Sequence, residues 1–172
     1  MTLAPLADIN SRFAIPGSLQ FIAGQGGLTA ADITCPLAAG RVYLHGAHIT
    51  QWQPAGHEPV LFLSDAAVFS EGKAIRGGVP ICHPWFGPAS LGPRAGDPTA
   101  PAHGLVRVLP WEVQATSAGP DGSVTVALLL KSTPQTRAQW PFDFTVELRV
   151  TFGAALTMEL RTCNTGTSPM PF

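Results

Sequence analysis

The segment DFTVELRVTF, residues 143–152, constrains the fold more than any other stretch of the sequence. Its apolar residues occupy every second position, and Thr145, Glu147 and Arg149 stand between them. Because side chains alternate between the two faces of a strand, this pattern predicts a strand with one buried face and one solvated face. Such a strand is typical of an antiparallel sheet that packs through one side only.

Further strand-like runs recur along the chain, separated by turns that contain glycine or proline. They cover residues 19–24, 31–37, 41–53, 59–64, 103–115, 122–132 and 155–164. The 18 glycines and 17 prolines are spread along the chain, and no long stretch combines a helical apolar period with caps. We therefore predict an all-β fold, an antiparallel β-sandwich that forms a single domain over residues 1–172.

Composition excludes several classes of partner. Charged residues make up only 12% of the chain, and the formal net charge of −1 has no long basic or acidic run behind it. Nothing therefore indicates a nucleic-acid partner, and no apolar run is long enough to span a membrane. The cysteines number three, an odd count without a CxxC pair, which is typical of free thiols in a reducing compartment. The N-terminus shows no signal peptide, so we expect a cytoplasmic protein.

The stretch GKAIRGGVPICHPWFGP, residues 72–88, combines glycines, prolines, cations and aromatic rings in a way that suggests a rigid binding loop. Arg76 precedes a Gly77-Gly78 pair that allows the backbone to approach a neighbour closely. Trp85 and Phe86 offer a flat apolar floor for the C–H faces of a sugar, or else they belong to the core. For Phe86 we favour the core.

The segment HGLVR places His103 and Arg107 four residues apart on a stretch read as extended, so that both side chains share one face. Together with Arg76 they suit an anionic substrate, because guanidinium forks bind phosphate oxygens in two places. The alternative is that each arginine braces a loop by pairing with a carboxylate. Carboxylates such as Asp65, Glu71 and Asp97 are candidates for this.

The histidines give no sign of a metal site. In LHGAH, His45 and His48 are three residues apart in a strand-like context, which directs the two rings to opposite faces. We expect His45, His48 and His57 to lie in the core or on the surface. The proline- and glycine-rich segment 87–102 is either a binding loop or a solvated excursion.

The chain resembles the hexose-6-phosphate mutarotases, also called glucose-6-phosphate 1-epimerases, of the galactose-mutarotase-like superfamily. The resemblance runs from about residue 30 to the end and includes the Arg-Gly-Gly-Val-Pro element followed by Pro-Trp-Phe-Gly. It is carried by LHGAHITQW (44–52), VLFLS (60–64), GKAIRGGVPICHPWFGP (72–88), AHGLVRVLPWEV (102–113) and WPFDFTVELRV (140–150). It implies a large sandwich, with the site on a concave sheet face, that interconverts the α and β anomers of an aldohexose 6-phosphate without a cofactor.

The resemblance also implies roles for individual residues. Arg76 and Arg107 match the phosphate clamp, and His103 matches the first catalytic histidine, near the ring and anomeric oxygens. Lys73, His83 and Trp85 match substrate-binding positions, although relatives commonly carry Trp where this chain has His83. The implied chemistry is acid–base: one group takes the anomeric proton and another protonates the ring oxygen, so that the ring opens and closes again.

One departure from the family concerns the end of the chain. Similar proteins continue beyond the position of Phe172 and supply there a second histidine and the glutamate usually assigned as general base. We therefore expect this chain to be the front part of a longer fold, with an unpaired sheet edge through which copies self-associate. Three hypotheses stay open: an isomerase, a non-catalytic domain that binds sugar phosphates, and a structural β domain whose arginines are braces.

Overall fold

The strand predicted at 143–152 is β7, Phe144–Phe152, in the computed structural model of the chain, which describes residues 3–88 and 100–171. Along β7 the apolar residues at even positions are buried, whereas Thr145 and Glu147 are partly exposed and Arg149 is exposed. The two-residue period of the sequence therefore sets the buried face of this strand, as predicted.

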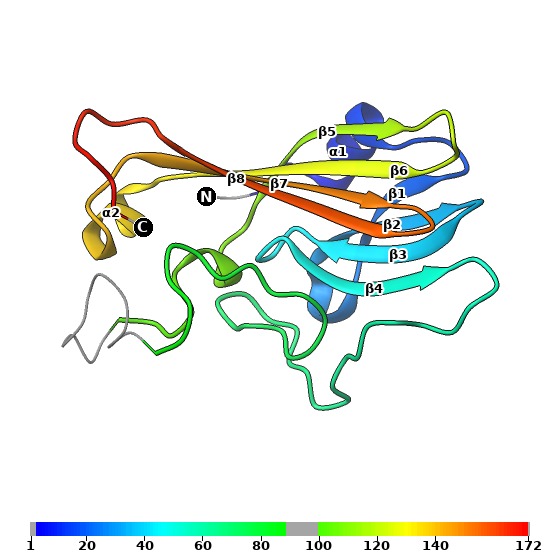
Figure 1. Cartoon of the computed structure of the whole chain (residues 1–172), viewed down its shortest axis with the longest axis horizontal. Helices are drawn as coiled ribbons and strands as arrows, with labels where there is room; N and C mark the ends of the chain where they lie inside the picture. Colours follow the sequence, from blue (N-terminus) through cyan, green and yellow to red (C-terminus); the bar gives the residue numbers. More distant parts are fainter. Residues whose placement is uncertain (1–2, 89–99, 172) are drawn as a thin grey trace.

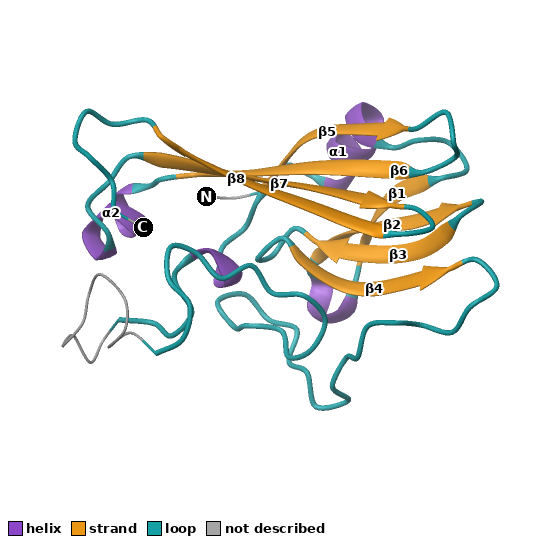
Figure 2. Cartoon of the chain, in the orientation of Figure 1, coloured by secondary structure: helices purple, strands orange, loops and turns teal. Residues whose placement is uncertain are grey.

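Two antiparallel four-stranded sheets make up the fold (Figures 1 and 2). The first has the order β1-β2-β3-β4, with β1 Leu19–Ala23, β2 Thr29–Cys35, β3 Ala38–Tyr43 and β4 His48–Pro54. The second has the order β5-β6-β7-β8, with β5 Glu112–Ala118, β6 Val124–Lys131, β7 and β8 Leu156–Asn164. Strands consecutive in sequence are neighbours in both sheets, so each sheet is a meander. The predicted all-β sandwich is confirmed.

The two sheets approach closely where β3 meets β7. A Cβ atom at Gly40 would lie 2.3 Å from ring atoms of Phe152, so only glycine leaves room for that ring. Two hydrogen bonds join the layers beside it: the indole Nε1 of Trp52 donates to the carbonyl of Gly153 at 3.2 Å, and the thiol of Cys35 donates to the carbonyl of Phe152 at 3.7 Å. Apolar side chains of both sheets form one core around this contact.

Three of the predicted strands differ from the structure by more than one or two end residues. The run 41–53 is a hairpin, because Gly46 (φ 73°) and Ala47 (φ 48°) turn the chain between β3 and β4. The run 59–64 contributes only an isolated bridge, Leu63 with Gly77. In 103–115 the strand begins at Glu112, because His103 and Gly104 have positive φ and the short 3₁₀ helix η3, Val106–Val108, follows.

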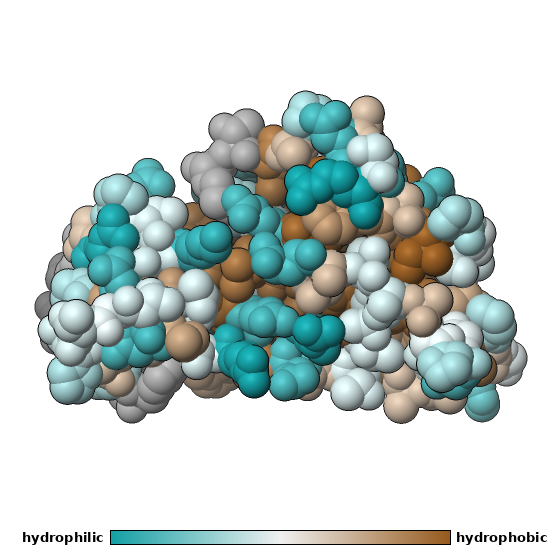
Figure 3. All heavy atoms as spheres, turned by 90° about the horizontal axis from the view of Figure 1, so that it is seen from above, coloured by the Kyte–Doolittle hydropathy of each residue, from teal (hydrophilic) through white to brown (hydrophobic). Residues whose placement is uncertain are grey.

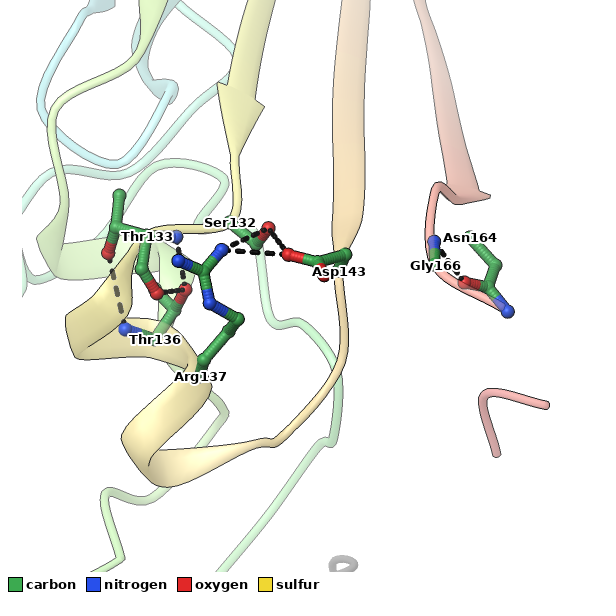
Figure 4. Close-up of polar contacts among 7 residues, drawn as sticks. All are labelled: Ser132, Thr133, Thr136, Arg137, Asp143, Asn164 and Gly166. Atoms are coloured by element: carbon green, nitrogen blue, oxygen red, sulfur yellow. Dashed lines mark hydrogen bonds and ion pairs between the residues drawn. The ribbon is translucent and has the colours of Figure 1, made fainter. Parts of the chain in front are cut away.

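The structure also contains two α-helices that the sequence analysis did not predict. Helix α1, Leu6–Phe13, buries Ile9 against the core. Helix α2, Pro134–Gln139, begins at a capping box in which Thr133 and Thr136 each accept the other's main-chain N–H. Arg137 anchors this helix to the start of β7 through an ion pair with Asp143 at 2.7 Å, and Ser132 donates to the same carboxylate (Figure 4). A further 3₁₀ turn, η1, spans Gln25–Gly27.

The long connection from β4 to β5 gathers at one side of the two sheets (Figure 1). It carries the 72–88 segment and the HGLVR segment, so both motifs lie in the same group of loops. Residues 89–99, most of the expected binding or solvated loop 87–102, and Phe172 lie outside the described residues. None of the helices in the described part of the chain has the length and apolar character needed to cross a lipid bilayer.

Candidate active site

The Arg-Gly-Gly segment lies between the first residues of β4 and the chain at Phe62–Ser64. Gly78 donates its N–H to the carbonyl of Phe62 at 2.6 Å, and Val79 exchanges two main-chain hydrogen bonds with Ile49. A Cβ atom at Gly77 would lie 2.6 Å from the oxygen of Phe62, and one at Gly78 would lie 2.2 Å from the oxygen of Ile49. The close backbone approach expected of the glycine pair is confirmed.

Two buried histidines, at either end of the β3–β4 turn, hold the main chain on both sides of Arg76. Ring atom Nε2 of His48 lies 2.7 Å from the carbonyl oxygen of Gly77, and Nε2 of His45 lies 2.7 Å from that of Lys73. The rings are only 1% and 5% exposed, so their place in the core, one of the two expected, is confirmed. The segment between them is a turn and not a strand, so the opposite-face expectation no longer applies.

His103 takes its position from an unusual backbone and from Phe86. It has a φ of 63°, and its main-chain N–H donates to the carbonyl of Gly87 at 2.8 Å. Its ring atom Nδ1 accepts the N–H of Gly87 at 3.1 Å, so the neutral ring carries its proton on Nε2. The ring of Phe86 packs edge-on against it, with centroids 4.9 Å apart. His103 therefore presents a fixed ring whose Nε2–H is a hydrogen-bond donor.

The three predicted cations differ in their surroundings. Lys73 and Arg76 are exposed, while Arg107 is half-buried and donates from Nη2 to the carbonyl of Ala102 at 3.0 Å. Within residues 3–88 and 100–171 none of the three forms an ion pair with a carboxylate. Asp65 and Glu71 therefore do not brace them, and Asp97 lies outside the described residues. Among the described carboxylates, none therefore forms an ion pair with Lys73, Arg76 or Arg107.

His48 connects the Arg76 loop with Arg107. It bonds the carbonyl of Gly77, the residue after Arg76, and the positive charge of Arg107 contributes to lowering its pKa. The same charge acts on Cys82, where it opposes the rise in thiol pKa that burial causes. His48 therefore contacts the main chain after Arg76, and the charge of Arg107 lies near enough to act on both His48 and Cys82. Arg107 and His103 do not share the face of a strand, because η3 lies in this segment.

The sequence model of the aldose 1-epimerase family matches residues 39–172, which is most of the chain. This chain belongs to the aldose 1-epimerase family. A protein of Salmonella typhimurium named "Putative glucose-6-phosphate 1-epimerase" is 44% identical over 117 residues, which cover 68% of this chain and 37% of that protein. Its counterparts named in the same way in Escherichia coli and Cenchrus ciliaris are 42% and 34% identical over 117 and 137 residues. The chain thus spans little more than a third of the curated relatives' length.

Solved structures agree with this assignment. The crystal structure described as "a putative mutarotase (YeaD) from Salmonella typhimurium" superposes with a TM-score of 0.78 and 35% identity, over 92% of this chain and 52% of that one. A galactose mutarotase-like protein of Clostridium acetobutylicum shares the fold at 9% identity, with a TM-score of 0.54. As a member of the aldose 1-epimerase family, the chain corresponds to about half of a relative of known structure.

Two of the site residues expected from the family resemblance lie in the core. The ring of His83 is 5% exposed and contacts the rings of Trp140 and Phe144, with centroids 5.8 and 5.7 Å apart. Burial lowers its pKa to about 4. Trp85 is 6% exposed and donates from Nε1 to the carbonyl of Pro101 at 3.0 Å. Both side chains are therefore buried in this chain, and their contact with a substrate stays a prediction.

Phe86 differs from the sequence prediction in the opposite sense, because it is exposed and not buried. Its side chain is 75% exposed, although we expected it in the core. In the segment Trp85-Phe86, the inner residue is the tryptophan, because its indole N–H has a main-chain acceptor. Of the two aromatic residues of this segment, Phe86 is the exposed one, and its ring packs against that of His103.

His48 is the residue of this site that sequence reasoning missed. LHGAH gave no signal for it beyond the Gly46-Ala47 turn that places the two histidines at its ends. A separate hollow of about 730 Å³ lies beside His45, Glu71 and Gly72. Its described lining residues include neither His103 nor the predicted cations, so we do not place a substrate there.

Proposed function

We propose that this chain binds an aldohexose 6-phosphate and carries the phosphate-binding and proton-donating part of a site that interconverts the α and β anomers. The observation that supports this most directly is the arrangement around His48, which ties the main chain beside Arg76 to the neighbourhood of Arg107. Two exposed or half-exposed guanidinium groups without carboxylate partners among the described residues suit a phosphate dianion. The names that the relatives carry agree with this substrate class.

In this proposal the residues divide the work of ring opening. Arg76 and Arg107 hold the phosphate, Lys73 adds positive charge, and the exposed face of Phe86 supports the sugar ring. His103, with its proton on Nε2, donates to the ring oxygen as the C1–O5 bond breaks, while a base takes the proton of the anomeric hydroxyl. The aldehyde then forms, the C1–C2 bond rotates, and reversal of the two proton transfers closes the other anomer.

A non-catalytic domain that binds sugar phosphates is the second candidate, because ring opening requires a general base in addition to the proton donor His103. Proton NMR of freshly dissolved α-glucose 6-phosphate, with and without the chain, separates the two. Faster anomer equilibration with the chain would place a complete acid–base pair here, and Asp65, Glu71 and Asp97 would be the bases to replace first. Phosphate-dependent shifts in the protein without faster equilibration would favour the binding domain.

The two arginines are expected to determine affinity. Arg76→Ala and Arg107→Ala should each weaken glucose 6-phosphate binding about tenfold or more, because a charge-assisted hydrogen bond contributes about 1.5–3 kcal/mol. Isothermal titration calorimetry measures this effect. Arg161→Ala, at an exposed arginine of β8, is the matched control and should bind normally. Unchanged affinity in both site variants, with lower stability alone, would support the hypothesis that the arginines are braces.

Strand β8 leaves one edge of its sheet without a partner in the described chain, and we propose that copies associate through it. Met158 and Leu160 face the same side as their buried cross-strand partners on β7 but are 36% and 45% exposed. Seen from above, the surface of the chain mixes hydrophilic and hydrophobic side chains (Figure 3). Sedimentation velocity should show a concentration-dependent dimer that Leu160→Lys weakens at least tenfold. Thr157→Lys, on the opposite face, should leave it intact.

We also propose that the protein works in the cytoplasm. Cys35, Cys82 and Cys163 are all free thiols in the structure, and Cys163 is exposed. Unpaired cysteines of this kind are typical of proteins in reducing compartments.

A further inference from the structure

Both imidazoles of the β3–β4 turn must donate to the loop that they contact. A carbonyl oxygen only accepts hydrogen bonds, so Nε2 of His48 carries the proton that meets the oxygen of Gly77, and Nε2 of His45 carries the proton that meets the oxygen of Lys73. These carbonyls lie on either side of Arg76. Two donors from one turn therefore fix the main chain before and after the predicted phosphate-binding side chain.

We propose that His48 is the positioning residue that holds Arg76 in its binding position, with His45 as a second anchor at Lys73. The expected effect on substrate affinity rests on the proposed function. The effect of His48 on the Arg76 segment does not, because it follows from hydrogen bonds within this chain. His48 bonds the residue directly after Arg76, so its effect on that side chain is the more direct of the two.

Burial excludes a direct role in the chemistry for His48. The residue is 1% exposed, and its Nδ1 is sealed from solvent with no hydrogen-bond partner among the described residues. A substrate hydroxyl cannot reach a ring in this position. In contrast, the ring lies directly beneath the glycine pair, because a Cβ atom at Gly78 would lie 3.1 Å from its Nε2.

The surroundings of His48 favour the neutral ring that this role requires. Burial lowers its pKa most, and the charges of His45 and Arg107 lower it further, whereas the bond to Gly77 opposes them. A proton added at Nδ1 would be buried near Arg107 without an acceptor among the described residues. His48 therefore stays a neutral donor with its single proton on Nε2.

The hydrogen bonds beside His48 provide a local readout. Gly78 donates to Phe62, Val79 donates to Ile49, and Ser64 donates to the carbonyl of Arg76. If His48 holds this segment, loss of its donor should let these three bonds open more often while the β6–β7 ladder is unaffected. Amide hydrogen exchange followed by NMR measures both regions in one sample.

The experiment compares two substitutions at one position. His48→Phe keeps a ring but removes the donor, and we expect exchange of the Gly78 amide to become at least tenfold faster and the affinity for glucose 6-phosphate to fall about tenfold. His48→Gln keeps an N–H at the end of the side chain and should return both values to within about threefold of the original chain. His57→Phe, at an exposed histidine of the loop after β4, should change neither value.

The outcomes separate this inference from the proposed function. Unchanged Gly78 exchange in His48→Phe would overturn the positioning role, and so would equally faster exchange at Val126 and Val150, which report the core. Local opening in His48→Phe that His48→Gln reverses would support the role, even if the original chain failed to bind glucose 6-phosphate. That failure would instead count against the proposed function.

Discussion

Gly78→Ala is expected to lower the free energy of unfolding by about 3 kcal/mol and to weaken phosphate binding at the same time. The residue has a φ of 60°, and an added Cβ would lie 2.2 Å from the carbonyl oxygen of Ile49, in the backbone of β4. The atom that clashes belongs to the backbone of Ile49 and not to a flexible side chain, so the Arg76 segment must move away from the strand. Urea unfolding gives the stability change, and calorimetric titration with glucose 6-phosphate gives the affinity.

Gly72→Ala is the matched control, because Gly72 belongs to the same loop and has a φ of 71° but no atom within 4 Å of an added Cβ. It carries the backbone strain without the clash and should cost about 1 kcal/mol. The difference between the two variants therefore measures the close approach of loop and strand. Equal losses in both would mean that backbone strain alone matters and that the fit of Gly78 against Ile49 does not.

The strands that the sequence predicts well are those in which packing repeats the local pattern. In β7 every second residue is apolar and buried, so a two-residue period is sufficient to locate it. The run 59–64 is equally apolar, yet Val60 and Phe62 are 56% and 77% exposed. Whether such a run finds a hydrogen-bonding neighbour depends on distant segments, here Gly77, which no local pattern encodes.

Helix α2 shows a limit of a different kind. Its Thr133 and Thr136 form a capping box, but a threonine in place of the usual Glu or Gln removes the sequence signature. With only six residues it also has no apolar period to detect. An ion pair between Arg137 and Asp143 also holds the helix to the segment before β7 (Figure 4). This contact cannot be predicted from the sequence before the path of the connecting turn is known.

The candidate site was predictable in its residue types and not in their orientation. Sequence motifs and residue chemistry are sufficient to predict the glycine pair, the arginines and His103 as site residues, because each role depends only on a local conformation or a charge. Which rings of the loop point inward depends on Trp140 and Phe144, which are distant in sequence and contact His83. Phe86 was therefore expected in the core but is exposed, whereas His83 was expected near the substrate but is buried. The buried position of His48 is visible only in the three-dimensional fold.

His83 is expected to make the protein much less stable in mild acid. Its pKa falls from the ordinary value of 6.5 to about 4 in the folded protein, because burial penalises the charged ring. Below pH 6.5 the unfolded chain binds a proton at this position that the folded chain does not bind until about pH 4. As the pH is lowered from 6.5 to about 4, the free energy of unfolding therefore decreases, by about 3 kcal/mol from this residue. The lowered pKa of His48 acts in the same direction.

His83→Phe tests the assignment, because an apolar ring of similar shape can pack against Trp140 and Phe144 and cannot be protonated. Urea unfolding at pH 7 and pH 4 should show a difference between the two pH values about 3 kcal/mol smaller in this variant than in the original chain. His57→Phe, at an exposed histidine, should keep the full difference. If His83→Phe kept it too, the acid sensitivity would come from other groups, and the ring would be protonated in the folded chain nearly as easily as in the unfolded one. A core position for His83 would then be wrong, and its substrate-facing role would have to be considered again.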